Sequence, residues 1–402
     1  MNFEQTTLVL VIILMASKWM AFFFKNLKMP ELVGEIMAGV ILGNLPLLGV
    51  DFDLADQMSK SGFLQYAAEF GVVILLFQVG LESSMKELAR VGLSSFNVAA
   101  LGVLIPVLAG VAMANATGFS TGIASWFVGA TLAATSVGIT AKILGDAGLI
   151  KTPSAQVILG AAVIDDVMGI LILTVLAGIA ATGAVSISEL GLIIAKASFF
   201  FAGCFFIGRW VLPRFLIFSD LNTSTGFWTA FALWLALAFA QVSALSGLAP
   251  IIGSFMAGLV LEEVHFSQTK QIKMKGLQEL LRPITDFMLP IFFVGVGAHV
   301  KLSVLGDVHT VFIIVLMLVV AMAGKLAAGA GVVGKGFDRI GIGIGMIPRG
   351  EVGLVFASFA LKNRIMSDGV YSVMVFVVLL TTVLGPICLR PRLKKFVSET
   401  SG

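Results

Sequence analysis

Residues 34–42 read Gly-Glu-Ile-Met-Ala-Gly-Val-Ile-Leu, and residues 253–261 read Gly-Ser-Phe-Met-Ala-Gly-Leu-Val-Leu. The chain therefore contains a faint copy of itself, displaced by 219 residues. Two further matches follow in the same order: Glu69-Phe70 and Gly80 with Asp286-Phe287 and Gly297, and Val137-Gly138-Ile139 with Val352-Gly353-Leu354. Any one match between small residues is weak, but three in register predict two related halves.

The composition places both halves in a membrane. Of the 402 residues, 58% are hydrophobic and 12% are charged, whereas roughly 25% are charged in a typical soluble protein. A globule of this size has too little interior to hide so much apolar surface. The formal net charge is only +3, so we expect no nucleic acid as a partner. Two cysteines and three histidines exclude a disulfide framework and a Cys/His metal site.

A helix that spans a bilayer needs about 20 mostly apolar residues. By this rule we count thirteen candidate spans, of which the second and the ninth are short and interrupted by glycine. They lie near residues 7–24, 31–50, 63–82, 93–114, 120–144, 155–180, 189–209, 226–247, 249–262, 284–304, 310–332, 341–360 and 370–391. The sequence thus predicts an all-α polytopic membrane protein of about 13 helices, with the lipid bilayer as its surroundings. The amino terminus lacks the basic region and cleavage site of a secretory signal, so we expect the first span to be retained.

The Lys and Arg residues alternate between the two sides of these spans. With the amino terminus outside, 18 of the 26 fall on the inner side, four on the outer side and four within spans. Cytoplasmic loops carry the excess of positive charge, so we expect an external amino terminus and a cytoplasmic carboxyl terminus. The sequence ends at Gly402, a few residues past the last span, and we expect no cytosolic regulatory domain.

Each of the three matches pairs one span with the seventh span after it. Because seven is odd, the two halves have opposite orientations in the membrane. We expect a first repeat over 7–180, a connecting helix over 189–209 and an inverted second repeat over 226–391. Inverted repeats are a signature of secondary transporters, whose substrate sites lie near the midplane on discontinuous helices. The sequence therefore predicts a transporter and not an enzyme.

Two adjacent aspartates, Asp165 and Asp166, stand about ten residues into the sixth span, a depth of about 15 Å at 1.5 Å per residue. A charge at that depth costs at least about 2.5–3 kcal/mol, and intramembrane ionisable residues are functional-site candidates. Neighbours on a helix point about 100° apart. We expect one aspartate to face the ion path and the other to take an interior partner. A pair of packing or cap residues is the alternative.

Lys325, in the eleventh span, is the candidate partner for an aspartate. That span runs from outside to inside, and helical side chains lean toward the amino end of their own helix. This direction aims the ammonium group at the midplane. The alternative is a lysine whose long stem carries its charge to the cytoplasmic surface.

Spans five and twelve are predicted to be broken. Span five contains Thr135-Ser136-Val-Gly-Ile-Thr, and span twelve contains Pro348-Arg349-Gly-Glu351-Val-Gly. Interrupted backbone is tolerated at this depth only where it faces protein or a water-filled cavity. Two crossing pairs of half-helices need charges to balance their dipoles, and Arg349 with Glu351 can supply them. A buried structural ion pair is the alternative for these two, while Thr135 and Ser136 offer oxygens to a hard cation.

Four stretches together resemble the bacterial monovalent cation/proton antiporters of the second group. They are Ile-Asp-Asp at 164–166, Thr-Ser-Val-Gly-Ile-Thr at 135–140, Gly-Lys-x-x-x-Gly at 324–329 and Pro-Arg-Gly-Glu-Val-Gly at 348–353. The likeness covers essentially the whole chain. It implies a scaffold/dimer part from spans 1–3 and 8–10, a mobile core part from spans 4–6 and 11–13, and a homodimer in the bacterial inner membrane.

The same resemblance implies roles for the site residues. Asp166 would bind the cation or proton, Asp165 would pair with Lys325, and both aspartates would be the Na⁺ ligands. Adjacent aspartates are typical of the electrogenic sodium/proton members. We therefore expect an electrogenic antiporter that exchanges Na⁺ or Li⁺ for two protons, with no cofactor beyond the transported ions.

Three alternatives stay open at this point. The first is a potassium/proton antiporter or gated potassium-efflux protein, although such relatives tend to replace the first aspartate with an amide and to carry a nucleotide-binding domain. The second is a sodium-coupled symporter for an organic anion, which the acidic pair disfavours. The third is an intramembrane aspartyl protease, which needs its aspartates on different helices and the second in Gly-x-Gly-Asp, a motif that this sequence lacks.

Overall fold

The computed structural model describes residues 2–27, 29–82, 92–149, 152–182, 187–212, 214, 225–246, 248–263, 276–334 and 336–398. Every regular element in these ranges is a helix, as the sequence predicts. The chain forms two compact units. The first unit comprises Met1–Ser61, Arg90–Leu173 and Phe293–Gly402, and the second comprises Gly62–Ala89 and Thr174–Phe292. The predicted division into a scaffold part and a core part stays a prediction.

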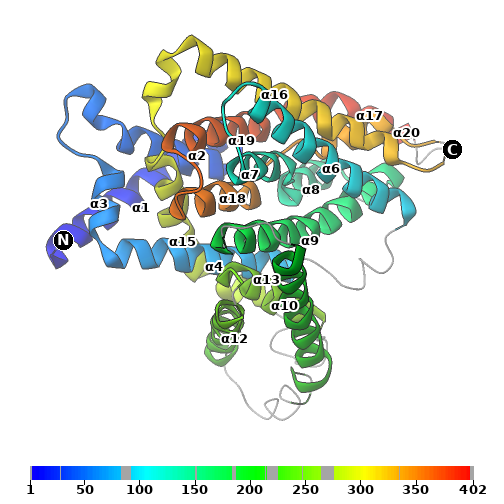
Figure 1. Ribbon diagram of the computed structural model, residues 1–402, viewed down its shortest axis with the longest axis horizontal. Helices are drawn as coiled ribbons and strands as arrows, with labels where there is room; N and C mark the ends of the chain where they lie inside the picture. Colours follow the sequence, from blue (N-terminus) through cyan, green and yellow to red (C-terminus); the bar gives the residue numbers. More distant parts are fainter. Residues whose placement is uncertain are drawn as a thin grey trace. The chain divides into compact units, whose positions relative to one another are not determined.

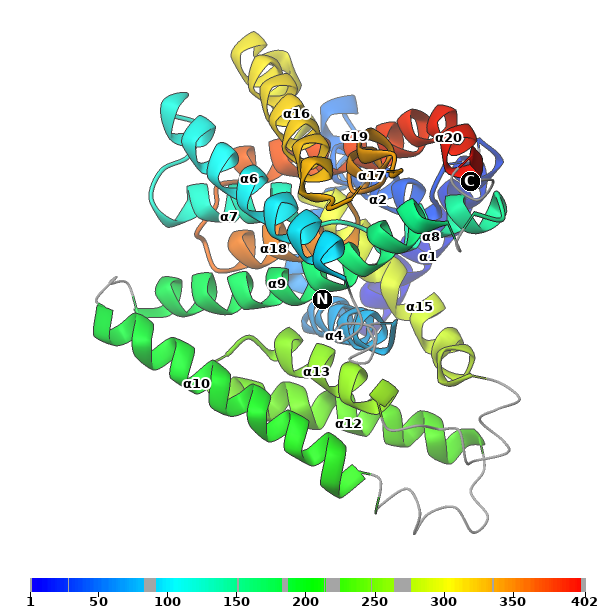
Figure 2. The ribbon, with the colours of Figure 1, turned by 90° about the vertical axis from the view of Figure 1, so that its right-hand side faces the viewer.

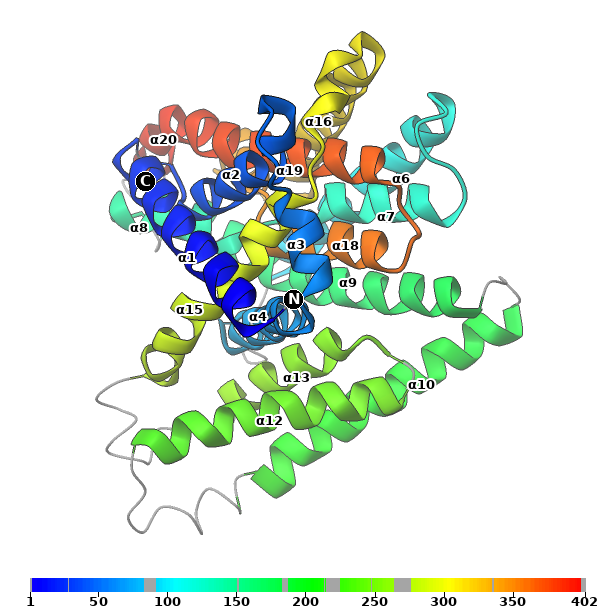
Figure 3. The ribbon, with the colours of Figure 1, turned by 90° about the vertical axis from the view of Figure 1, so that its left-hand side faces the viewer.

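Long and short helices alternate in the first unit (Figure 1). The long ones are α1 (Phe3–Asn26), α6 (Leu93–Ala116), α9 (Pro153–Thr182, which continues into the second unit), α16 (Val308–Ala328) and α19 (Asp368–Leu389). The shorter ones are α2 (Glu31–Gly43), α3 (Leu54–Lys60), α7 (Ile123–Ala133), α8 (Val137–Asp146), α17 (Arg339–Gly345), α18 (Glu351–Lys362) and α20 (Leu393–Ser398). Helix α1 packs against α2 (Figure 3), and α6 packs against both α7 and α16.

The second unit is a smaller group of helices. It holds α4 (Gly62–Glu82), α10 (Ile187–Phe206), α12 (Thr225–Leu245), α13 (Pro250–Glu263) and most of α15 (Leu277–Ala298). Helix α13 packs against α4, α10 and α12, and Figures 2 and 3 show α10, α12 and α13 side by side. The break expected between the eighth and ninth spans is present, since α12 ends at Leu245 and α13 begins at Pro250. Proline is favoured at the first position of a helix.

Eight of the described helices are long and apolar enough to cross a membrane. They are α1, α4, α6, α9, α12, α15, α16 and α19. Three shorter apolar helices, over Ile123–Ala133, Pro250–Leu261 and Val352–Lys362, do not reach that length. All thirteen predicted spans fall on helical segments, but the short and interrupted ones do not meet the length rule alone. The number thirteen therefore stays a prediction.

Small residues bring α6 and α16 close together in the first unit. A Cβ atom on Gly324 of α16 would stand 2.8 Å from Cγ of Pro106 in α6. A Cβ atom on Gly102 of α6 would stand 3.6 Å from Nζ of Lys325. Close helix approach through small residues is the usual packing mode in membranes. Here it also leaves the space that the lysine side chain fills.

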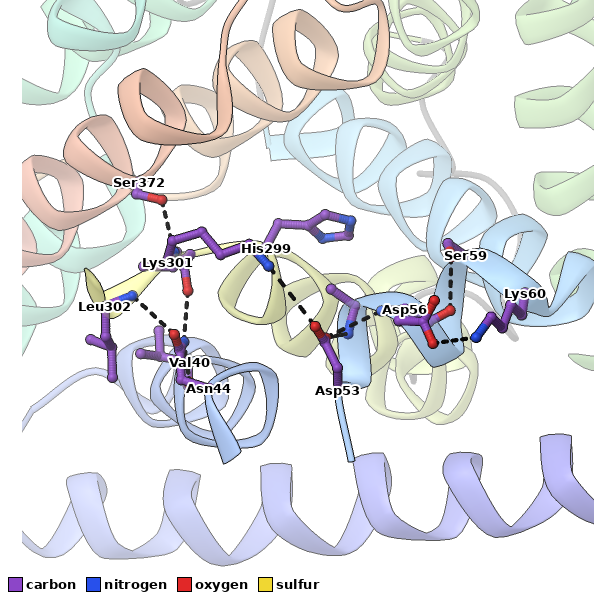
Figure 4. A network of polar contacts seen from close by, with 12 residues as sticks. Val40, Asn44, Asp53, Asp56, Ser59, Lys60, His299, Lys301, Leu302 and Ser372 are labelled. Carbon is purple, nitrogen blue, oxygen red and sulfur yellow. Dashed lines mark hydrogen bonds and ion pairs between the residues drawn. The ribbon is translucent and has the colours of Figure 1, made fainter. Parts of the chain in front are cut away.

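A polar network joins the end of α2 to the segment after α15 and to the start of α19 (Figure 4). The Asn44 amide donates to the carbonyl oxygen of Val300 at 2.7 Å and accepts from the N–H of Leu302 at 2.9 Å. The N–H of Lys301 donates to the Ser372 hydroxyl at 2.8 Å. A backbone group without a partner is costly when buried. These side chains satisfy the backbone where the helices end.

Helix α16 begins at an aspartate cap. The carboxylate of Asp307 accepts the Thr310 hydroxyl at 2.7 Å and the N–H groups of Thr310 and His309 at 3.0 and 3.2 Å. These bonds, the hydroxyl bond foremost, hold the pKa of Asp307 below its ordinary value, because they favour the charged form.

Glycines let the backbones of α2 and α15 touch. A Cβ atom on Gly39 would overlap the carbonyl oxygen of Val294, and one on Gly297 would overlap the carbonyl oxygen of Ile36. Both approaches lie in the first unit. The two helices therefore cross with no side chain between them.

The second unit contains a crossing of the same kind between α4 and α13. A Cβ atom on Gly80 would overlap the carbonyl oxygen of Phe255, and one on Gly258 would overlap the carbonyl oxygen of Phe77. Each crossing thus has a glycine in close approach on each of its two helices.

We expect Gly39→Ala to lower thermal stability, because overpacking a tight contact costs about 1–3 kcal/mol. Gly203→Ala is the matched control. Gly203 lies inside α10 with open space around its Cα, and alanine is the better helix former by about 1 kcal/mol. Melting curves in detergent check both variants. Equal stability of Gly39→Ala and the wild type would contradict the close crossing.

Candidate functional site

Asp165 and Asp166 lie side by side on α9, twelve and thirteen residues after the helix begins. Both are buried, with 2% and 7% of their surface exposed. The sequence predicts one aspartate to face the ion path and the other to take an interior partner. The structure buries both, and their division of roles stays a prediction. Their burial makes each carboxylate dependent on what surrounds it.

Lys325 meets Asp165 directly. Its Nζ atom lies 3.1 Å from Oδ1 of Asp165, and both side chains are almost wholly enclosed. The predicted contact between these two residues is confirmed. A lysine that reaches the membrane surface is excluded, because Lys325 has no exposed surface.

The second oxygen of Asp165 has no such partner. Among the described residues, no hydrogen-bond donor reaches the buried Oδ2 atom. A buried carboxylate oxygen without a donor is costly unless water or a cation satisfies it. Lys325 therefore satisfies only one of the two carboxylate oxygens of Asp165.

The predicted breaks in spans five and twelve are present, and they cross each other. Helix α7 ends at Ala133 and α8 begins at Val137, while α17 ends at Gly345 and α18 begins at Glu351. The N–H of Ser136 donates to the carbonyl oxygen of Pro348 at 2.8 Å, so the two interrupted segments share a backbone hydrogen bond. Two helix carboxyl ends and two helix amino ends therefore converge in the first unit.

Hydroxyl groups tie the crossing together. The Thr140 hydroxyl donates to the carbonyl oxygen of Gly345 at 2.7 Å, and that of Thr135 donates to Met346 at 3.4 Å. Ser136 is buried, and its Oγ atom lies 2.8 Å from where a Cβ atom on Gly350 would stand. The structure thus places Thr135 and Ser136 at the crossing, and their role as cation ligands stays a prediction.

Helix α9 passes along this crossing. Ile158 of α9 packs where Gly345 of α17 has no side chain, and Gly169 of α9 lies against Phe356 of α18. Gly345 and Phe356 stand on opposite sides of the break in span twelve. The two aspartates lie between Ile158 and Gly169 on α9, and therefore at the level of the break.

Arg349 places a cation where helix carboxyl ends converge. Its side chain is fully buried, and its guanidinium donates to the carbonyl oxygens of Leu132, Ala321 and Ile347. Leu132 lies in the last turn of α7, where exposed carbonyl groups favour positive charge. The predicted use of Arg349 to balance a helix dipole agrees with these contacts. The side chain of Glu351 lies outside the described residues, so its pairing with Arg349 stays a prediction.

Two residues at the site escaped the sequence analysis. The Thr382 hydroxyl, on α19, donates to the carbonyl oxygen of Arg349, and Gly102 borders the lysine. Thr382 could have been found from the sequence, because the pair Thr381-Thr382 lies inside an otherwise apolar span. Nothing in the sequence distinguishes Gly102 from the many other glycines.

Within the described part of the chain, no three His, Cys, Asp or Glu side chains gather in a way that could hold a metal ion. Any cation bound near the aspartates would therefore take further oxygens from hydroxyl groups, carbonyl groups or water. This set of hard oxygen donors suits an alkali cation better than a transition metal.

Comparison with known proteins gives a consistent result. The family model described as sodium/hydrogen exchanger, transmembrane, matches residues 9–395. The high-affinity Na(+)/H(+) antiporter NhaS3 of Synechocystis is 33% identical, over 95% of this chain and 88% of that protein. The Na(+)/H(+)-K(+) antiporter GerN of Bacillus cereus is 30% identical, over 95% and 94%. The structure of the sodium proton antiporter MjNhaP1 of Methanocaldococcus jannaschii covers 98% of this chain, with a TM-score of 0.75 and 18% identity, which is a likeness of fold. The chain is a multi-pass membrane protein that belongs to the sodium/hydrogen exchanger family.

Proposed function

We propose that this protein exchanges Na⁺ for protons across the membrane, with Asp166 and Asp165 as the carboxylates that bind the ions. The observation that carries this proposal is the enclosed Lys325–Asp165 pair beside Asp166, at the level of two crossing broken helices. The names of relatives that match nearly the whole chain support sodium/proton antiport. The transported ions leave the site chemically unchanged, so the proposed function is that of a transporter and not of an enzyme.

The exchange follows from the charge of the site. A carboxylate in a narrow pocket is neutralised either by a proton or by a desolvated Na⁺, and not by both at once. A carboxylate paired with a proton or a cation can pass the apolar barrier between the two sides, whereas a bare carboxylate pays a desolvation penalty. Each crossing of the site therefore carries one ion species, and the two species exchange.

The Lys325–Asp165 pair sets how many protons move for each Na⁺. When a cation enters, Asp165 turns from the ammonium group to the cation, and Lys325 releases a proton. Asp166 releases a second proton as it binds the same cation. Two protons then move for each Na⁺, so transport is electrogenic.

Potassium is the second candidate cation. The relative GerN carries both sodium and potassium in its name, and an oxygen-lined site can accept either ion. The adjacent aspartates favour sodium, because the potassium-efflux relatives tend to replace the first with an amide.

We further propose the inverted repeat and thirteen spans. The glycine crossings support the repeat, because Gly39 and Gly258 are 219 residues apart and Gly80 and Gly297 are 217 apart. These are the offsets of the sequence matches, and the crossing of α2 with α15 repeats as the crossing of α13 with α4. A repeat of six helices and six, joined by the connecting helix, gives thirteen.

The assembly and location follow the resemblance. We expect a homodimer through the scaffold part, in the plasma membrane of a bacterial cell. The bacterial relatives support this location. The positive-charge asymmetry supports an external amino terminus and a cytoplasmic carboxyl terminus.

Asp166→Asn is expected to abolish Na⁺-driven proton flux and to leave the melting temperature near that of the wild type, because asparagine keeps the shape of the side chain and cannot ionise. Asp51→Asn is the control, since Asp51 is exposed in a loop. Dequenching of a pH dye in proteoliposomes, with Na⁺, Li⁺ and K⁺ in turn, measures the flux. Sustained transport by Asp166→Asn would refute the assignment.

Lys325→Gln alone is expected to destabilise the protein, since breaking a buried pair costs about 3–5 kcal/mol. The double change Asp165→Asn with Lys325→Gln should recover part of that loss, because no lone charge stays buried. Any transport that survives in the double variant should be electroneutral. The test measures the thermal stability of the wild type, Lys325→Gln, Asp165→Asn and the double variant, together with their flux under an imposed membrane potential. If the loss of stability in the double variant equals the sum of the losses in the two single variants, the two charges do not interact.

The orientation is tested with single cysteines at Asn2 and Ser401, in a protein whose own Cys204 and Cys388 are replaced. An impermeant maleimide should label the first site in intact cells, and the second only after lysis. Labelling of the Ser401 site from outside would overturn the proposed topology.

A further inference from the structure

The residues after the last long helix run back along α17. At the end of α19, Gly385 lies against Pro348, with 2.6 Å between its built Cβ position and the proline ring. Leu389 is fully buried in a cluster with Ile344 and Ile347. The carboxyl-terminal part of the chain therefore follows residues 338–349 in the opposite direction, and α17, α19 and α20 lie together in Figures 1 and 2.

An ion pair continues this contact. Arg392 donates from Nε to Oδ2 of Asp338 at 3.0 Å, and from Nη2 to Oδ1 of the same carboxylate. The Asp338 side chain is 7% exposed and that of Arg392 is 22% exposed. A bidentate arginine–carboxylate contact fixes the relative orientation of the two side chains as well as the distance between them. It therefore holds the segment before α17 in one orientation.

An aromatic ring closes the contact. Phe396, on α20, has no exposed surface. A Cβ atom on Gly341 would stand 2.5 Å both from this ring and from Oδ2 of Asp338. Gly341 thus lies under the ring and the carboxylate at once, with no room for a side chain.

Asp338 also reaches the helix that carries the aspartates. Its N–H donates to the Ser154 hydroxyl at 3.1 Å, and Ser154 is fully buried near the start of α9. Asp338 therefore joins three parts of the first unit: the carboxyl-terminal segment, α17 and α9.

Helix α17 has only seven residues. A helix this short has little stability of its own. In the interrupted segment that follows, the helical hydrogen bonds end with the one from the N–H of Ile347 to the carbonyl oxygen of Ile344 at 3.0 Å. Its position must come from its neighbours. Arg349, four residues after α17 ends, depends on that position for its contacts with the crossing.

We propose that residues 390–398 form a brace that sets the position of α17, and that Arg392 and Phe396 are positioning residues for ion exchange. The inference rests on the proposed function for its transport readout. The brace acts through α17 and Asp338 on the crossing, and neither Arg392 nor Phe396 touches the ion. Arg392 thereby helps to position α17, whereas the nearby Lys394, which is exposed, does not.

The test compares wild type with Arg392→Gln, Arg392→Lys, Asp338→Asn, Phe396→Ala and the double change Asp338→Asn with Arg392→Gln. Lys394→Gln is the control, since it removes one positive charge from the same segment. In proteoliposomes, Arg392→Gln and Asp338→Asn should each raise the apparent KM for Na⁺ by about tenfold. Arg392→Lys should give a smaller rise, and the double change should be no worse than Arg392→Gln. Lys394→Gln should match the wild type.

Hydrogen–deuterium exchange supplies a readout that does not depend on transport. The amides of residues 339–349 should exchange faster in Arg392→Gln and in Phe396→Ala, and at the wild-type rate in Lys394→Gln. Unchanged exchange, or a lower melting temperature with an unchanged KM, would overturn the positioning role. If the wild type does not exchange Na⁺ for protons, the proposed function fails, while the deuterium arm still decides whether the brace exists.

Discussion

The enclosed contact between Lys325 and Asp165 is the constraint on which the rest of the site depends. Neither charge can be buried alone at acceptable cost, so the helices that carry them must meet. Helix α16 reaches this position only because Gly324 and Gly102 remove side chains where it passes α6. The contact satisfies one carboxylate oxygen and leaves the other without a donor among the described residues. The same interaction thus holds the helices together and leaves one buried carboxylate oxygen for the ion binding that we propose.

Around this pair, charge is balanced mainly by backbone groups. The guanidinium of Arg349 donates to the carbonyl oxygens of Leu132 and Ile347, near the ends of interrupted helices. The hydroxyl groups of Thr140 and Thr382 donate to other carbonyl groups of the crossing. A broken helix at membrane depth survives only when its freed backbone groups find such partners. The crossing is therefore well suited to hold a site whose charge changes during transport.

Much of this arrangement was predictable from the sequence, and the limits have physical causes. Charged residues, glycines and prolines are unfavourable in the middle of a membrane span unless they have a partner or a function. Their positions in the sequence therefore predicted the buried aspartates, the lysine partner and both helix breaks. The pairing of Arg392 with Asp338 was not predictable, since a basic residue after the last span looks like a topology signal. Nor was the role of Gly102, because the absence of a side chain matters only once its neighbour is known. Short helices such as α2 and α13 are apolar enough to be recognised in the sequence, but their length alone does not show whether they cross a membrane.

Pro348 has a consequence for desolvation at the crossing. It supplies the carbonyl oxygen that accepts from Ser136, yet as a proline it has no N–H of its own. The interrupted segment therefore carries one fewer donor that would have to be hydrated or paired in a medium of low dielectric constant. Any other residue there would bring an extra N–H group, which would either stay unsatisfied or recruit a water molecule. Such a water would stand at the crossing itself, so the imino acid keeps the crossing drier than its open backbone would otherwise allow.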